Sequence, residues 1–171
     1  MIIIGYQGIG KSTLAGKNGC IDLESGNFWV DGKRADDWYV PYCQIANHLS
    51  QQGYTVFVSS HEVVRNELLK SGEHVVAIVP SPKLKDEWIK KLKDRYERTG
   101  LEKDFKAWKN AEDRYVENII EIAEGCYNTI VLYGMDYILS DVIASIVVPR
   151  PIDIKAWNGE LNSCLIYGGD E

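Results

Sequence analysis

The first residues of the chain constrain its fold more than any other stretch. The three isoleucines at 2–4 are typical of a buried strand, and residues 5–12, GYQGIGKS, match the pattern G-x-x-x-x-G-K-S/T. Glycines let backbone N–H groups turn inward around an anion, and a helix that starts there adds unpaired donors and its positive dipole end. Residues 11–15 suit such a helix. The pattern predicts a phosphate-binding loop between a strand and a helix.

The loop pattern also predicts what is bound. Lys11 would reach the β- and γ-phosphates of a nucleotide, and the Ser12 hydroxyl would be a ligand of Mg²⁺. We therefore expect ATP and Mg²⁺ as cofactors. The residues expected to contact the nucleotide are Gly5, Gln7, Gly8, Ile9, Gly10, Lys11, Ser12 and Thr13.

Composition limits the classes of partner. A chain of 171 residues with 45% hydrophobic residues suffices for one core, and we expect a single domain. A net charge of −6 without a basic cluster argues against nucleic acid and membrane surfaces, so small molecules are the expected partners. Four dispersed cysteines without a C-x-x-C pair, and no apolar run long enough for a signal peptide or a membrane span, predict a reduced, cytoplasmic protein.

Strand-like and helix-like segments alternate along the chain. Strands are predicted at 2–4, 20–23, 54–58, 74–79 and 129–132, and the segments between them, together with 137–147, read as helices or loops. This order predicts an α/β fold with a doubly wound, mainly parallel five-stranded sheet covered by helices on both faces. Ligands should then gather at the carboxyl ends of the strands, where the glycine-rich loop lies.

Acidic residues near the loop are few. The strand at 54–58 runs into Ser59-Ser60-His61 instead of an acid, so Asp22 and Glu24, at the end of the strand at 20–23, take the acidic role by elimination. Asp22 is expected near the Mg²⁺ and the acceptor hydroxyl, unless it serves only as a turn former. Either carboxylate can be the catalytic one.

The chain lacks the Asp-x-x-Gly and Asn/Thr-Lys-x-Asp patterns of GTPases, and it is short for a helicase or a motor. Its size, N-terminal loop, strand order and late helical segment resemble nucleoside-monophosphate and small-molecule kinases with a phosphate-binding loop, such as adenylate, shikimate and phage-encoded deoxynucleotide kinases. The resemblance implies a P-loop NTPase fold over 1–171, a helical lid-like insertion at 83–125, and an unassigned tail at 149–171. It also implies that Asp22 corresponds to the strand-two aspartate of shikimate-type kinases, and that Arg65 binds the acceptor.

The expected lid is locally basic. Residues 83–114 hold 11 of the 19 Lys and Arg residues against 8 acids, in a chain that is acidic as a whole. Positioned cations stabilise the charge that phosphoryl transfer spreads over equatorial oxygens, so Arg95 and Arg98 are candidate catalytic residues beside Lys11 and Asp22. The alternative is a pair of solvated helices with Glu–Lys pairs.

The resemblance also implies that the segment between the second and third strands binds the acceptor, and several aromatic residues lie in it. Trp38 and Tyr42 have the spacing of a core helix face, whereas Phe28 and Trp29 could equally stack on a base. His61 is either a structural hydrogen-bonding group or a contact to substrate.

The sequence thus predicts an ATP-dependent kinase that acts on a nucleoside or a (deoxy)nucleoside monophosphate. The alternative is a regulatory switch ATPase that acts through a protein partner.

Overall fold

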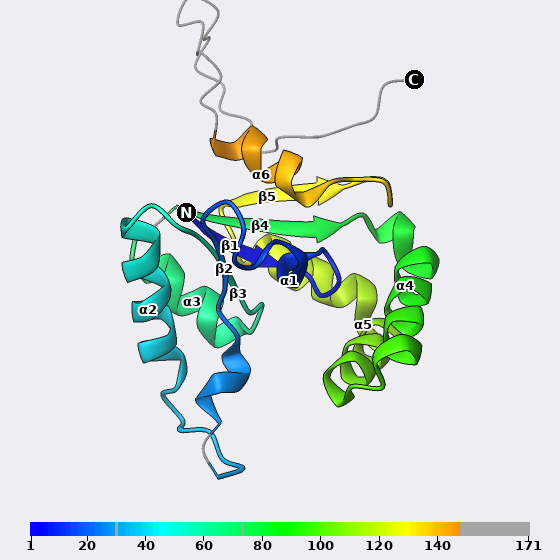
Figure 1. Cartoon of the computed structure of the whole chain (residues 1–171), viewed down its shortest axis with the longest axis horizontal. Coiled ribbons are helices and arrows are strands. Elements are labelled where there is room, and N and C mark those ends of the chain that lie inside the picture. Colours follow the sequence, from blue (N-terminus) through cyan, green and yellow to red (C-terminus); the bar gives the residue numbers. More distant parts are fainter. Residues whose placement is uncertain (30, 73, 148–171) are drawn as a thin grey trace, which may run out of the picture.

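The computed structural model describes residues 1–29, 31–72 and 74–147. In these residues five strands form one all-parallel sheet in the order β2-β3-β1-β4-β5 (Figure 1). The strands are β1 (Ile2–Gly5), β2 (Cys20–Asp22), β3 (Thr55–Val58), β4 (Val75–Pro80) and β5 (Asn128–Leu132). The α-helices are α1 (Lys11–Leu14), α2 (Tyr39–Gln51), α3 (Glu62–Lys70), α4 (Lys85–Thr99), α5 (Glu102–Glu124) and α6 (Leu139–Val147), and the 3₁₀ turns are η1 (Ser25–Phe28) and η2 (Pro82–Leu84).

The predicted α/β class and five-stranded sheet are confirmed, and the sheet is entirely parallel rather than mainly so. Each predicted strand lies within one or two residues of an observed one. β4 extends one residue past its predicted end, to Pro80 opposite Leu132, and the next N–H, from Ser81, bonds to the Leu132 carbonyl. The two 3₁₀ turns were not predicted. The predicted tail at 149–171 lies outside the described residues.

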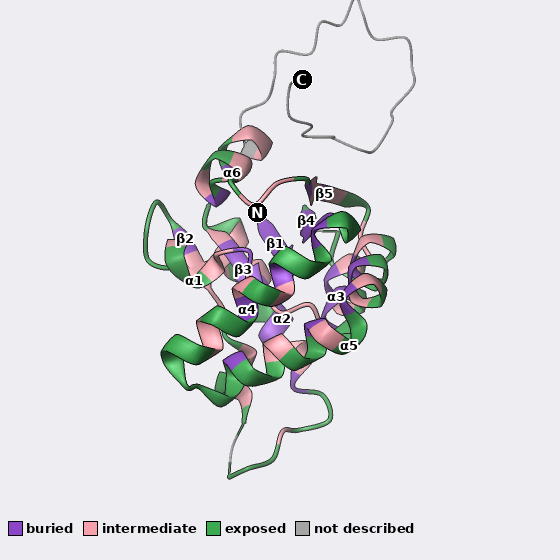
Figure 2. Ribbon diagram, turned by 90° about the vertical axis from the view of Figure 1, so that its right-hand side faces the viewer, coloured by how far each residue is buried: buried purple, intermediate pink, exposed green. Residues whose placement is uncertain are grey.

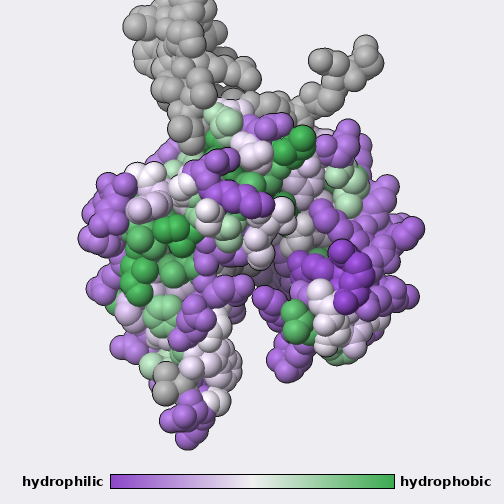
Figure 3. Space-filling view, viewed as in Figure 1, coloured by the Kyte–Doolittle hydropathy of each residue, from purple (hydrophilic) through white to green (hydrophobic). Residues whose placement is uncertain are grey.

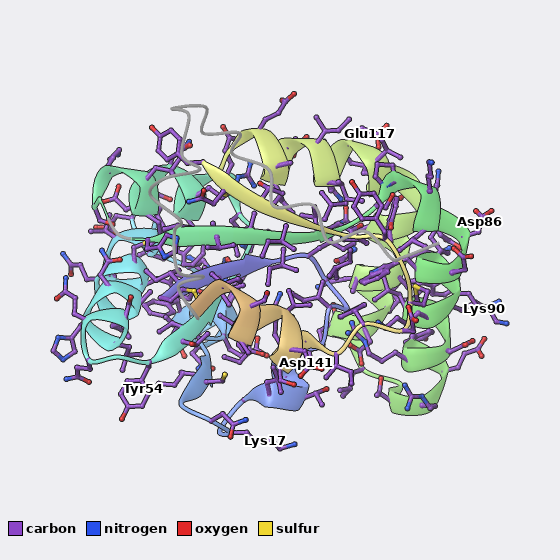
Figure 4. The ribbon with its side chains drawn as sticks, turned by 90° about the horizontal axis from the view of Figure 1, so that it is seen from above. Lys17, Tyr54, Asp86, Lys90, Glu117 and Asp141 are labelled. Carbon is purple, nitrogen blue, oxygen red and sulfur yellow. The ribbon has the colours of Figure 1, made fainter. Side chains whose placement is uncertain are left out.

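Helices cover both faces of the sheet. The short α1 and α6 lie on one face, while α3 and α5 lie on the other (Figure 4). The central strands β1 and β4 are buried along their whole length, as expected for parallel strands with helices on each side. Buried residues accordingly concentrate on the strands and on the inward sides of the helices (Figure 2).

The helical hairpin of α4 and α5 is built into this core at its base. Trp88 and Leu92 of α4 are fully buried, as is Tyr115 of α5, and α5 packs on β4. Gly100 makes the turn between the helices with φ of +62°. Helix α5 is kinked at Arg114, which has φ −138° and ψ 31°. On the side of this kink toward the turn, Ala111 is still fully buried, whereas Leu101 and Phe105 near the turn are exposed.

The topology places a crevice at one edge of the sheet. β1 and β4 are neighbours, but the chain leaves β1 toward β2 and leaves β4 toward β5. Connections that diverge in this way leave a crevice outside the carboxyl ends of the strands, where ligands of open α/β sheets bind. The glycine-rich loop follows β1 directly and therefore lies in this crevice.

Candidate functional site

A cleft of about 740 Å³ occupies this edge of the sheet. Its floor is the loop after β1, one wall is formed by residues 22–25 and 58–59, and the other by α4 with the first residues of α5. Residues 135 and 137–140 close the side nearest α6. Figure 3 shows the hollow between the lobe of α2 and η1 and the lobe of α4 and α5.

The loop needs its glycines for two different reasons. Gly8 and Gly10 have φ of +86° and +106°, a region that L-residues rarely adopt. At Gly8 space is also limiting, since an added Cβ would lie 2.9 Å from Cδ2 of Leu92 and 3.2 Å from Nε1 of Trp88. The backbone of the loop therefore approaches α4 more closely than any side chain at Gly8 allows.

Side chains from distant parts of the chain hold the loop in shape. Trp88 Nε1 donates to the Gln7 carbonyl at 2.9 Å, and Tyr137 OH donates to the Ile9 carbonyl at 2.9 Å. Gln7 Nε2 in turn donates to the Ala107 carbonyl at 2.7 Å. The Trp88 and Tyr137 rings stack, with centroids 6.1 Å apart and planes 9° apart. Hydrogen bonds to the Gln7 and Ile9 carbonyls, and one from the Gln7 side chain, thus hold the loop in place.

Lys11 turns back over the loop. Its Nζ donates to the Gly5 carbonyl at 2.6 Å. Burial lowers the pKa of Lys11, and the carboxylates of Asp22 and Glu24 oppose that change, while the Arg95 guanidinium adds to it. An ammonium group with so little hydration is stabilised by any anion that enters the cleft.

Ser12 and Asp22, which the sequence assigns to a metal, lie together. Ser12 Oγ donates to Asp22 Oδ2 at 3.0 Å across the ends of α1 and β2. Hydroxyl and carboxylate oxygens are the ligands that Mg²⁺ prefers. Glu24 also lines the cleft, but at its mouth, where its Oε1 lies 3.6 Å from Nζ of Lys103 on α5.

The α4 wall is cationic. Lys91, Arg95 and Arg98 follow one another at helical spacing and all line the cleft. Arg95 Nη2 pairs with the buried Asp104 carboxylate at 2.9 Å, and Asp104 also accepts from Thr99 at 2.6 Å. Arg98 is exposed, and its Nε donates to the Asp94 carbonyl at 3.3 Å.

Lys91 was missed by the sequence analysis. Its Nζ lies 4.4 Å from the centroid of the Trp88 ring and donates to Tyr137 OH at 3.3 Å. Loss of hydration lowers the pKa of Lys91, and the neighbouring Arg95 lowers it further. The only sequence signal was its position one helical turn before Arg95.

Arg65 does not join this group. The side chain is buried, and its Nη1 donates to the Ser60 carbonyl. It lies against the C-terminal end of α5, where a Cβ added to Gly125 would come within 2.7 Å of Arg65 Nε. Arg65 is not among the residues that line the cleft.

The wall opposite α4 is held by Tyr42. Its OH donates to the Leu23 carbonyl at 2.7 Å and accepts from the Ser59 N–H at 2.9 Å, which ties the ends of β2 and β3 together. Ser59 Oγ lies 2.8 Å from His61 Nδ1, so this histidine is hydrogen-bonded within the protein.

The aromatic residues near this wall divide into core and surface. Trp38 and Tyr42 are buried, as their spacing predicted, and Phe28 packs on both rings. Trp29 is 55% exposed, and the Arg34 guanidinium lies 5.1 Å from its ring centroid.

Comparison of the chain with protein-family models, with curated proteins and with solved structures finds no match. Within the described residues, no helix is long and apolar enough to cross a membrane. In the same part of the chain, no three His, Cys, Asp or Glu side chains are grouped so that they could hold a metal ion.

Proposed function

We propose that the protein is a P-loop kinase that transfers the γ-phosphoryl group of Mg·ATP to a small hydroxyl acceptor. The observation that carries this proposal is the meeting of Lys11, Ser12 and Asp22 at the floor of the cleft, at the carboxyl ends of β1 and β2. A general anion-binding turn would need the glycines and the lysine, but it would not need a hydroxyl paired with a carboxylate.

The residues of the floor fit a nucleotide with its metal. Gly8 and Gly10 provide the backbone conformation for inward-pointing N–H groups, and Lys11 provides a poorly hydrated cation. A nucleotide-bound Mg²⁺ takes most of its ligands from phosphates and water, so Ser12 and Asp22 suffice without a cluster of three protein ligands. When bound, Mg²⁺ neutralises charge on the β- and γ-phosphates.

The remaining residues of the cleft have roles that follow from their placement. The Asp22 carboxylate, or that of Glu24, orients an acceptor hydroxyl and takes its proton. Lys91, Arg95 and Arg98 face the loop from α4 and stabilise negative charge on the phosphoryl oxygens. The proposal places the protein in the cytoplasm, where ATP and Mg²⁺ are supplied.

Lys11→Met tests the proposal, with Lys17→Met as its control. Lys17 lies in the exposed turn after α1 and does not line the cleft (Figure 4). Loss of one charge-assisted contact should weaken Mg·ATP binding about 10- to 100-fold for Lys11→Met, while Lys17→Met binds as the wild type does.

The assay is a calorimetric titration with Mg·ATP, followed by a screen for ADP that forms only when a nucleoside, nucleotide or other small hydroxyl compound is added. Equal ATP affinity for the wild type and Lys11→Met would reject the proposal. ATP binding with slow hydrolysis that no acceptor accelerates would favour the switch ATPase instead.

A further inference from the structure

We propose that the acceptor is an uncharged hydroxyl compound, such as a nucleoside, rather than a nucleoside monophosphate. This inference rests on the proposed kinase function and decides between its two classes of acceptor. It comes from the way charge is distributed over the two walls of the cleft.

The two walls differ in sign. The wall of α4 and α5 carries Lys91, Arg95, Arg98 and Lys103. The wall at the ends of β2 and β3 carries two carboxylates and two hydroxyls. Its lining residues are Asp22, Leu23, Glu24, Ser25, Val58 and Ser59, and none of these is basic. Triphosphate oxygens are therefore matched by the α4 wall, and the acceptor faces the acidic one.

The cation paired with the acidic wall is Lys103 of α5, which is already matched by Glu24, and the two arginines of this region are held by backbone carbonyls. Arg34 Nη2 donates to the Ser25 carbonyl at 2.7 Å, and the guanidinium lies 4.0 Å from the Trp38 ring centroid. Arg65 is buried against Ser60 and Gly125, behind the cleft rather than in it. Neither arginine is placed to receive an acceptor phosphate.

His61 does not replace these arginines. Loss of hydration around the ring, which packs edge-on against Trp38 at 5.5 Å, lowers the pKa of His61, and Arg34 and Arg65 lower it further. The imidazole is therefore biased toward its neutral form, and Nδ1 is already bonded to Ser59 Oγ.

These groups suit hydroxyl recognition. Asp22 and Glu24 accept hydrogen bonds from neutral O–H groups, and Ser59 both donates and accepts. A phosphate dianion placed here would face two carboxylates, and Lys103, which pairs with Glu24 at 3.6 Å, offsets only one of them, so the contact is of the unfavourable kind that excludes a ligand. The wall thus selects against the charged acceptor as well as for the neutral one.

Phosphoryl transfer to a neutral acceptor needs only Mg·ATP, the acceptor hydroxyl and a carboxylate of the acidic wall. The acceptor oxygen forms a bond to the γ-phosphorus of ATP as the bond from that phosphorus to the bridging oxygen breaks. ADP keeps the electron pair of the broken bond. The hydroxyl proton passes to the Asp22 or Glu24 carboxylate and then to water.

The test compares the common ribo- and deoxyribonucleosides with their own 5′-monophosphates at saturating Mg·ATP. We expect kcat/KM for acceptor-dependent ADP formation to favour a nucleoside over its monophosphate by at least ~100-fold, the effect of like-charge contacts worth several kcal/mol. Glu24→Gln removes one of the two carboxylate charges. It should therefore lower the ratio of kcat/KM for a nucleoside to kcat/KM for its monophosphate about tenfold or more. Glu117→Gln, on the outer side of α5, should leave it unchanged (Figure 4).

The outcomes separate this inference from the function on which it rests. A monophosphate that is phosphorylated as well as its nucleoside, or better, would overturn the inference and leave the kinase proposal standing. Mg·ATP binding without phosphorylation of either series, and without binding of either beside a non-hydrolysable ATP analogue, would reject both. A preference for the nucleoside that Glu24→Gln does not narrow would also overturn the charge argument.

Discussion

The close packing of the glycine-rich loop on α4 can be tested by adding a single methyl group at Gly8. The Cβ of Gly8→Ala would lie 2.9 Å from Cδ2 of Leu92 and 3.2 Å from Nε1 of Trp88. Both of these side chains are fully buried, so neither can swing into solvent to make room. Trp88 is held further by its hydrogen bond to the Gln7 carbonyl.

Two costs add at this position. The backbone cost of a left-handed conformation for an L-residue is about 1–2 kcal/mol, and overpacking of a buried site costs about 1–3 kcal/mol more, so Gly8→Ala should lose about 2–5 kcal/mol of unfolding free energy. Gly16 isolates the first cost, because its φ is +78° and no atom lies within 4 Å of an added Cβ. Gly16→Ala should therefore lose only about 1–2 kcal/mol.

Urea unfolding monitored by tryptophan fluorescence gives both free energies, with equal m-values as the check that the denatured states are comparable. Leu92→Val removes the δ-methyl that the added Cβ would meet. In that background Gly8→Ala should cost less than in the wild type, by about 0.5–3 kcal/mol of coupling. Equal losses for Gly8→Ala and Gly16→Ala, with no coupling to position 92, would refute the close contact between loop and α4.

Two further predictions concern the hairpin of α4 and α5. Lys91→Met should weaken Mg·ATP binding about tenfold in calorimetric titrations, whereas Lys90→Met, on the outward side of the same helix, should not change it (Figure 4). Since the pKa values of Lys11 and Lys91 are both lowered and an anion needs them charged, wild-type affinity should fall as pH rises, starting below the ordinary lysine value of about 10.4. Unaltered affinity in Lys91→Met would remove Lys91 from the site. Hydrogen exchange should slow on addition of Mg·ATP and a nucleoside in residues 93–110, beyond the kink at Arg114, and change little at 115–122, which pack on the sheet. Equal protection in both segments would argue against closure of residues 93–110 over the cleft.

The sheet and the floor of the site could be predicted because they depend on local patterns. Apolar runs separated by turn residues locate the strands, and the alternation with helices makes the sheet parallel. Ser12 and Asp22 were both expected at the carboxyl edge of this sheet, and the structure brings them to 3.0 Å although β3 lies between β1 and β2.

The walls of the cleft depend on contacts between distant segments, and there the sequence falls short. Arg65 follows β3 at a spacing that suits an acceptor contact, yet it shares the buried face of α3 with Val64 and Leu68 and points toward α5. Lys91 looks like one of many solvated lysines until Tyr137, from the segment before α6, comes within 3.3 Å. Helical spacing gives the face of a residue but not the element opposite that face.

The mouth of the cleft shows which of its contacts a ligand can replace. Within the described residues, one ion pair joins the acidic wall to α5. It links Glu24 Oε1 to Nζ of Lys103 at 3.6 Å, and both side chains are exposed. Exposed pairs contribute about 0–1 kcal/mol, whereas a charge-assisted hydrogen bond to an anion contributes about 1.5–3 kcal/mol. Under the proposed function, Lys103 would gain by leaving Glu24 for a phosphate oxygen, and Glu24 would be released at the same moment to accept a hydrogen bond from the acceptor hydroxyl. Because one exchange frees both groups, filling the α4 wall with a polyphosphate should strengthen acceptor binding at the wall opposite, and the reverse must hold to the same extent.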